Sequence, residues 1–117
     1  MGVRRMKFED LQIKVLEWAD DKDLLHHKNC EKQFMKFVEE VFEFKSEMDL
    51  DHFVYGRVMN DNTKLEMGDI FVTLIILCEQ IGIDSVVCLD MAYEKIKDRK
   101  GKTLHGTFVK EEDLEDE

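Results

Sequence analysis

The sequence contains no proline and only six glycines in 117 residues. Without proline, no position inside a helix lacks the backbone donor that the helical ladder requires. The chain is rich instead in glutamate, lysine, leucine and methionine, which are good helix formers. This composition predicts an all-α fold of one domain, in which long helices are joined by short connections.

Cysteine is also scarce, and Cys30, Cys78 and Cys88 lack the Cys-x-x-Cys spacing of zinc and redox sites. Because the count is odd and no signal peptide is evident, we expect reduced thiols and a cytoplasmic location. Long apolar runs are missing as well. The longest, from Ile70 to Cys78, is too short to cross a bilayer, so we expect no membrane partner.

The chain lacks the positive charge that a nucleic-acid backbone attracts, since its formal net charge is −10. Residues 111–117 are acidic everywhere except at Leu114 and hold six of these ten charges. This pattern predicts a domain over residues 1–110 followed by a disordered acidic tail. A strongly acidic domain can still bind a small polyphosphate if metal ions screen its carboxylates.

Apolar residues recur at helical spacing in four segments, which predict helices over residues 8–19, 31–48, 64–80 and 85–100. The β-branched run at 70–77 resembles a buried strand. However, the uninterrupted segment around it is too long for a strand, so we interpret it as a buried helix. Four helices with short connections predict a four-helix bundle.

The predicted helix ends follow from capping residues. We expect Asn62 or Thr63 to cap the third helix, after a less regular connection over residues 49–62. Gly82 is expected to end the third helix and Gly101 the fourth, because glycine adopts the left-handed conformation that often follows a helix. The last part of the domain, residues 103–110, is expected to form a short extended segment.

Two acidic motifs lie on consecutive predicted helices: Glu39-Glu40-x-x-Glu43 on the second, and Glu66-x-x-Asp69 on the third. Residues three apart on a helix share a face, so the two motifs can each direct two carboxylates to one point. If the helices pack side by side, four carboxylates meet, and they repel one another unless a cation lies among them. Oxygen-only ligands suit a hard cation such as Mg²⁺.

Two simpler interpretations of these acids remain open at this point. Glutamate is common on helices, and either motif alone is more often a pair of solvated charges than a metal site. Carboxylates inside a helical bundle can also bind two iron ions, but such sites use Glu-x-x-His motifs. The four histidines lie outside that spacing, which disfavours iron: His26, His27, His52 and His105.

The residues around the acids carry a wider resemblance. The segments 36–43 (KFVEEVFE) and 66–72 (EMGDIFV) are followed by 92–102 (AYEKIKDRKGK) and 106–110 (GTFVK). In this order and spacing they resemble the MazG-like group of all-α nucleoside triphosphate pyrophosphohydrolases, in particular its short phage and Firmicute members. The resemblance covers residues 8–110.

The resemblance implies a Mg²⁺-dependent enzyme, with Mn²⁺ as a substitute, that hydrolyses (d)NTPs between the α and β phosphates. The products would be a nucleoside monophosphate and pyrophosphate, and the task nucleotide-pool house-cleaning. By the same resemblance, the metal ligands are Glu40, Glu43, Glu66 and Asp69. Glu39, beside them, is the candidate for a supporting carboxylate or water-activating base.

The resemblance also favours phosphate contacts for three cations, Lys36, Lys95 and Arg99, which are otherwise interpreted as solvated or paired surface charges. Lys36 lies one turn before Glu40, and the other two lie four apart on the predicted fourth helix. Family members assemble as dimers or dimers of dimers, so we expect a homodimer or homotetramer. That assembly would cover apolar faces that one small domain leaves open.

The nucleotide base has several candidate contacts. His52, Phe53, Tyr55 and Arg57 could line a base pocket or pack among themselves in a surface loop. Gln33 and Trp18 are further candidates, although Trp18 is expected to lie in the core. The alternative to an enzyme is a non-catalytic, oligomeric helical protein that binds nucleotides or acts as an adaptor.

Overall fold

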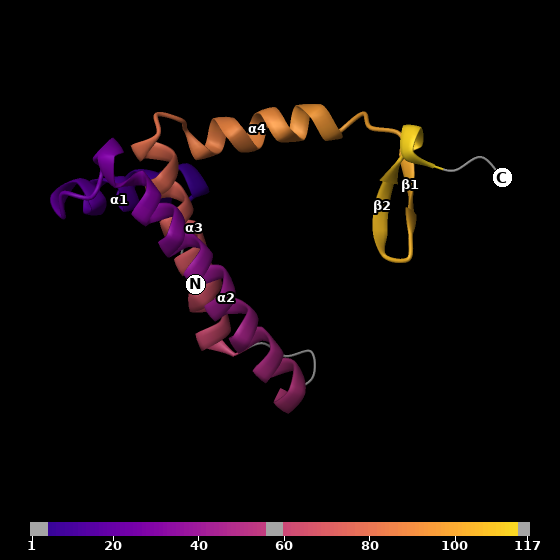
Figure 1. Ribbon diagram of the computed structural model, residues 1–117, viewed down its shortest axis with the longest axis horizontal. Coiled ribbons are helices and arrows are strands. Elements are labelled where there is room, and N and C mark those ends of the chain that lie inside the picture. Colours follow the sequence, from indigo (N-terminus) through magenta and orange to yellow (C-terminus); the bar gives the residue numbers. More distant parts are fainter. Residues whose placement is uncertain (1–4, 56–59, 115–117) are drawn as a thin grey trace. The chain divides into compact units, whose positions relative to one another are not determined.

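A computed structural model describes the backbone of residues 5–55 and 60–114 and the side chains of residues 5–50 and 60–114. It divides the chain into two compact units, Met1–Ser85 and Val86–Glu117. Over the described residues the chain forms four α-helices, as the sequence predicted, and a two-stranded hairpin (Figure 1). The fold is therefore mainly helical.

The first unit contains α1 (Phe8–Asp21), the short 3₁₀ helix η1 (His27–Asn29), α2 (Cys30–Tyr55) and α3 (Asp61–Gln80). Helices α2 and α3 lie side by side, and α1 packs against α3 (Figure 1). The 3₁₀ helix contacts both α2 and α3. The long α2–α3 pair is therefore the frame that positions the acidic motifs.

The end of α3 confirms the predicted stop near Gly82. The Ile83 N–H donates to the Cys78 carbonyl at 2.9 Å, and the Gly82 N–H donates to the Glu79 carbonyl at 3.1 Å. Gly82 has a φ of +81°, which glycine adopts without the steric penalty of a Cβ. These are the two hydrogen bonds of a Schellman motif, and they satisfy carbonyls that the helix leaves open.

The start of α3 and the end of α2 differ from the predictions. The Asn60 side chain caps α3 by accepting a hydrogen bond from the Thr63 N–H at 3.1 Å, so the predicted cap at Asn62 or Thr63 was wrong. Helix α2 continues to Tyr55, although residues 49–62 were predicted to be irregular. No glycine or proline interrupts the chain between Cys30 and Gly56, which explains the longer helix.

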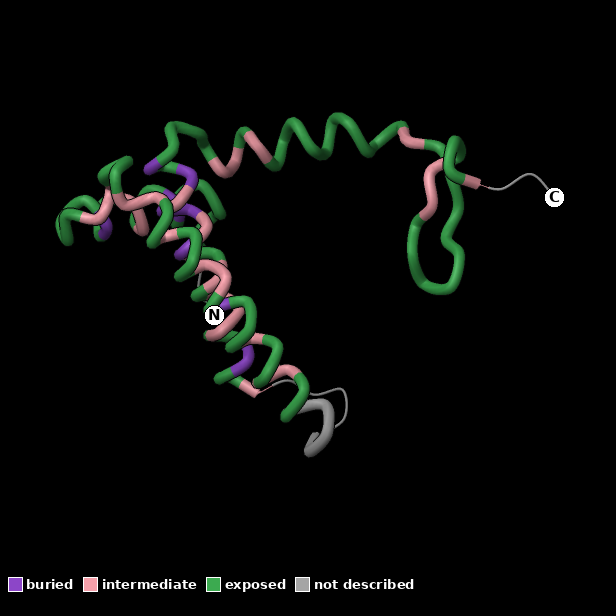
Figure 2. Tube along the Cα trace, viewed as in Figure 1, coloured by how far each residue is buried: buried purple, intermediate pink, exposed green. Residues whose placement is uncertain are grey.

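The buried core is small and lies in the first unit. Its buried apolar residues are Ala19, Ile75, Ile76 and Cys78. Figure 2 shows the buried positions within α1, α2 and α3, and two of these core residues, Ile75 and Ile76, confirm the predicted buried helix at the β-branched run. At the edge of the core, the rings of Phe8 and Phe71 meet edge to face with centroids 6.0 Å apart, which fixes α1 on α3.

Many apolar side chains lie on the surface instead. Trp18, predicted to lie in the core, is half exposed, and Phe42 and Leu65 are each 67% exposed. An amphipathic pattern identifies the apolar face of a helix, but it does not say whether the same chain covers that face. None of the described helices is by itself long and apolar enough to cross a membrane. Helices α3 and α4 taken together meet the criteria for a membrane span, by length and composition only.

Helix α4 (Ser85–Ile96) begins at the boundary of the units and ends four residues before the predicted Lys100. A turn follows the helix, in which the Arg99 N–H donates to the Ile96 carbonyl at 3.0 Å. The prediction that Gly101 ends this helix was therefore wrong. Gly101 begins a strand instead.

The rest of the second unit is a hairpin of β1 (Gly101–Leu104) and β2 (Thr107–Lys110), followed by the 3₁₀ helix η2 (Glu111–Asp113). The two turn residues, His105 and Gly106, have φ values of 52° and 80°, as a two-residue hairpin turn of type I′ requires. The expected extended segment is thus a hairpin. The first three residues of the predicted acidic tail form η2, and residues 115–117 lie outside the described part.

Candidate metal centre

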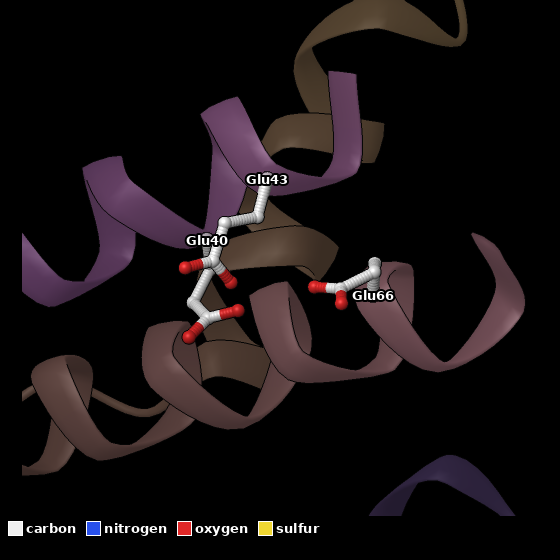
Figure 3. A group of neighbouring side chains, drawn as sticks. All are labelled: Glu40, Glu43 and Glu66. Atoms are coloured by element: carbon white, nitrogen blue, oxygen red, sulfur yellow. The ribbon is translucent and has the colours of Figure 1, made fainter. Parts of the chain in front are cut away.

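Three carboxylates from the two long helices of the first unit meet at one point. Glu40 and Glu43 come from α2 and Glu66 comes from α3 (Figure 3). One carboxylate oxygen of each lies within 4.8 Å of those of the other two. The structure therefore brings together three of the four predicted metal ligands.

The packing of α2 against α3 explains why these residues meet. The Gln33 side chain of α2 donates a hydrogen bond to the Thr73 carbonyl of α3 at 3.1 Å. Glu40 follows Gln33 by seven residues, and Glu66 precedes Thr73 by seven. Seven residues make about two turns of helix, so the faces that meet at the Gln33 contact meet again at the two glutamates.

Two of the carboxylate oxygens are buried without a partner. Glu40 is only 6% exposed, and its Oε2 atom accepts no hydrogen bond from any residue that the structure describes. The same holds for Oε2 of Glu66 within the described part of the chain. A buried carboxylate oxygen without a partner is unfavourable, because it has lost its hydrogen bonds to water and gained none in return. A cation between the helices would satisfy both atoms.

The donor set fits a hard divalent cation. All three residues offer carboxylate oxygens, which Mg²⁺, Mn²⁺ and Ca²⁺ prefer to nitrogen or sulfur. Two oxygens on one Mg²⁺ lie at most about 4.2 Å apart. Separations of up to 4.8 Å are slightly wider than that limit, and the exposed Glu43 side chain has the freedom to close the difference.

The charges of the cluster change the protonation of its exposed member. The negative charge of Glu40 raises the pKa of the Glu43 carboxyl above its usual value, and a hydrogen bond with Glu40 adds to the effect. The charge of Glu66 acts in the same direction. Glu43 therefore binds a proton more readily than an isolated glutamate does, which is the expected response of clustered carboxylates without a cation.

Lys36, a predicted phosphate contact, lies against the cluster. Its Nζ atom is 3.2 Å from Glu40 Oε1 and 3.9 Å from Glu39 Oε2. The hydrogen bond to Glu40, followed by the charge of Glu40, raises the pKa of Lys36. The predicted base, Glu39, lies on the solvent side of this pair and is well exposed.

The fourth predicted ligand, Asp69, does not join the cluster. It follows Glu66 by three residues on α3 and is exposed, and its carboxylate is outside the group of three found among the described residues. A spacing of three turns a helix by about 300°, so Glu66 and Asp69 are neighbours on one side but point some 60° apart. Only Glu66 of this motif is directed between the helices.

The other two predicted phosphate contacts, Lys95 and Arg99, belong to the second unit. They line a hollow of about 420 Å³ together with Asp98, Lys100, Lys110, Glu111 and Glu112. Lys95 lies in the last turn of α4, whereas Arg99 lies beyond its end, so the prediction of both on one helix was wrong. The hollow carries both signs of charge.

The candidates for base recognition have different outcomes. Gln33 holds α2 against α3. It lies two turns before Glu40 and therefore on the same face of α2, a spacing that could have indicated this structural role. Trp18 lines an apolar hollow of about 340 Å³ with Leu11, Lys14, Val15 and Val72. The side chains of His52, Phe53, Tyr55 and Arg57 lie outside the described residues.

Comparison with known proteins finds a relative in a phage. The chain is 38% identical over 81 residues to an uncharacterized 18.2 kDa protein from the rep-hol intergenic region of Haemophilus phage HP1 (strain HP1c1). The aligned part is 67% of this chain and 45% of the phage protein, so the chain spans less than half the length of this relative. No family model matches the chain. No solved structure matches it either.

Proposed function

We propose that this protein is a Mg²⁺-dependent hydrolase of nucleoside triphosphates that cleaves between the α and β phosphates. The observation that carries the proposal is that Glu40 and Glu66 each have a buried oxygen that accepts no hydrogen bond from the described residues, on carboxylates that cluster with that of Glu43 between two packed helices. A cluster of solvated helix charges would not place carboxylate oxygens out of water. The resemblance to the MazG-like group supplies the reaction.

In this proposal Glu40, Glu43 and Glu66 would hold the cation, and Asp69, exposed and one turn further along α3, would be its fourth ligand. Bound there, the cation would neutralise the charge of the phosphates and polarise the phosphorus that is attacked. Water adds to that phosphorus, and the products are a nucleoside monophosphate and pyrophosphate. Glu39 accepts the proton of the water, and its exposed position leaves it accessible to solvent.

Lys36, Lys95 and Arg99 are the proposed phosphate contacts. A triphosphate carries more negative charge than one divalent cation neutralises, so ammonium and guanidinium groups would stabilise the rest. We also propose a homodimer or homotetramer. The first unit leaves many apolar side chains exposed, among them Phe42 and Leu65, and a second chain would cover them.

The test is the release of pyrophosphate from a panel of (d)NTPs in the presence of Mg²⁺. We expect release by the wild type and a loss of a hundredfold or more in Glu43→Gln and Glu66→Gln, as an order of magnitude for a removed metal ligand. The matched control is Glu31→Gln, an exposed glutamate of α2 outside the cluster, which should retain activity. A wild type that is inactive with every nucleotide, or cluster variants as active as the control, would contradict the proposal.

A non-catalytic nucleotide-binding or adaptor protein is the second candidate. The same experiment separates the two, because an adaptor would bind a nucleotide tightly without releasing pyrophosphate. The cluster of three carboxylates favours the enzyme, since nucleotide binding alone does not require a cation held between helices.

A further inference from the structure

Lys36 covers the buried end of the carboxylate cluster. Its ammonium lies 3.2 Å from Glu40 Oε1, and the Lys36 side chain is 53% exposed while that of Glu40 is 8% exposed. The Lys36 ammonium therefore reaches Glu40 from the solvent side. The other carboxylate oxygen, Oε2, is the buried atom that accepts no hydrogen bond among the described residues.

A second lysine on α2 shows what an ordinary pair at this spacing looks like. Lys45 lies 2.8 Å from Asp49, again four residues apart, and both side chains are 59% exposed. Such a pair contributes little to helix stability, because both charges are already well hydrated. The Lys36 pair differs because its acid is buried and belongs to the cluster, so the ammonium offsets charge where water cannot.

We propose that Lys36 is the internal counter-ion of the carboxylate cluster, and that a divalent cation and the triphosphate displace it from Glu40 together. A divalent cation bound by Glu40 lies within several ångströms of the ammonium, and the two positive charges repel. The cation alone is then bound weakly. A triphosphate supplies anionic oxygens to both, so the complex of cation and nucleotide is bound in preference to the free cation.

The flexible stem of lysine suits this exchange. The ammonium is a compact charge on a four-carbon chain, and more than half of the side chain is exposed, so it can leave Glu40 without a movement of α2. One turn of helix separates the two residues, which keeps the released ammonium close to any phosphate that the cation binds. The part of the proposal that concerns the triphosphate rests on the proposed function, whereas competition with the cation does not.

The first experiment measures the binding of Mn²⁺ alone, by calorimetry and by the electron paramagnetic resonance signal of free Mn²⁺. We expect Lys36→Met to bind Mn²⁺ about tenfold more tightly than the wild type, because the repulsion is gone and the stem is kept. Lys45→Met loses the same charge outside the cluster and should bind like the wild type. Equal or weaker binding by Lys36→Met would overturn the proposal.

The second experiment measures the binding of an α,β-methylene triphosphate in the presence of Mn²⁺. The quantity compared is the preference for the complex, which is the affinity for Mn²⁺ with the nucleotide divided by the affinity for Mn²⁺ alone. This preference should fall at least tenfold in Lys36→Met, and Lys36→Arg should restore it. Lys36→Gln, checked for helical content by circular dichroism, serves if the methionine variant misfolds. An unchanged preference in these neutral variants would overturn the coupling.

The two proposals can fail separately. If the wild type releases no pyrophosphate while Lys36→Met still tightens Mn²⁺ binding, the proposed hydrolase activity is wrong and the proposed role of Lys36 as counter-ion is supported. If pyrophosphate is released but Mn²⁺ binding does not tighten, the counter-ion is wrong and the hydrolase stands.

Discussion

Glu40 and Glu66 lie opposite each other on α2 and α3, and each has a buried Oε2 atom that accepts no hydrogen bond from the described residues. The two helices thus hold two carboxylate oxygens in a place where water does not reach them. Burial of these carboxylates lowers the free energy of unfolding in the absence of a cation. A bound cation would raise the free energy of unfolding instead. The cluster should therefore make the stability of the protein depend on divalent cations.

Divalent cations are expected to raise the midpoint of thermal unfolding. At a cation concentration a hundredfold above the dissociation constant, binding to the folded state alone adds about 2.7 kcal/mol to the free energy of unfolding. Glu66→Gln should remove most of this shift, because it replaces a ligand on α3. The measurement is a thermal melt with Mn²⁺ or with a chelator, and Glu31→Gln should keep the wild-type shift. A shift of equal size in both variants would place the bound cation elsewhere.

The central part of this site could be predicted from the sequence. Glu40 and Glu43 share a face of one helix, and Glu66 begins a motif on the next, so their meeting required only that the two helices pack side by side. The exclusion of Asp69 from the group could not be predicted, because spacing gives the helix face only to within about 60°. The partner of Lys36 was also open, since a lysine near four acids can pair with any of them.

Helix ends show the same division between local and non-local causes. Gly82 ends α3 through hydrogen bonds within one turn, so a local pattern sufficed to predict it. Gly101 looked equally like a helix end. Its role lies in a strand pairing, where a Cβ on Gly101 would stand 2.2 Å from the Val109 carbonyl oxygen. Only the fold of the hairpin shows that close approach.

Cation binding is expected to weaken as the pH falls. The pKa of Glu43 is raised above its usual value, so in the cation-free protein this carboxyl keeps its proton at a pH where an isolated glutamate has lost it. A proton on Glu43 competes with the cation, so the affinity for Mn²⁺ should drop as the pH falls below the raised pKa of Glu43. Titrations of Mn²⁺ at several pH values measure this. Glu43→Gln, with weaker binding throughout, should lose this part of the dependence.

The stability of the cation-free protein should change in the opposite direction. A carboxyl whose pKa is raised by folding binds its proton more tightly in the folded state, so its contribution is most favourable below the usual pKa. That contribution is lost as the pH rises through the raised value. Chemical unfolding in a chelator should therefore show a smaller loss of stability between pH 4.5 and the raised pKa in Glu43→Gln than in the wild type. Identical profiles would mean that Glu40 does not perturb Glu43.

Two glycines of the first unit are expected to respond oppositely to alanine. Gly82→Ala should lower the free energy of unfolding by about 1 kcal/mol, because its φ of +81° is strained for any residue with a Cβ. Gly68 lies inside α3, where an added Cβ would meet nothing within 4 Å among the described residues, so Gly68→Ala should stabilise by about 0.5–1 kcal/mol. Denaturant unfolding measures both. A destabilised Gly68→Ala would indicate that a second chain approaches this part of α3.

The exposed apolar side chains predict that Leu65→Lys weakens self-association. Leu65 is 67% exposed and directly precedes Glu66, and Phe42, equally exposed, directly precedes Glu43. A lysine at position 65 would lose the apolar burial of leucine at an interface, about 1.5–3 kcal/mol per contact site, and would add a charge that must be desolvated. Light scattering over a range of concentrations should show a dimer or tetramer for the wild type and a smaller mass for Leu65→Lys. Glu31→Gln changes the net charge by the same amount and should keep the wild-type mass. A wild type that is monomeric at every concentration would contradict the proposed assembly.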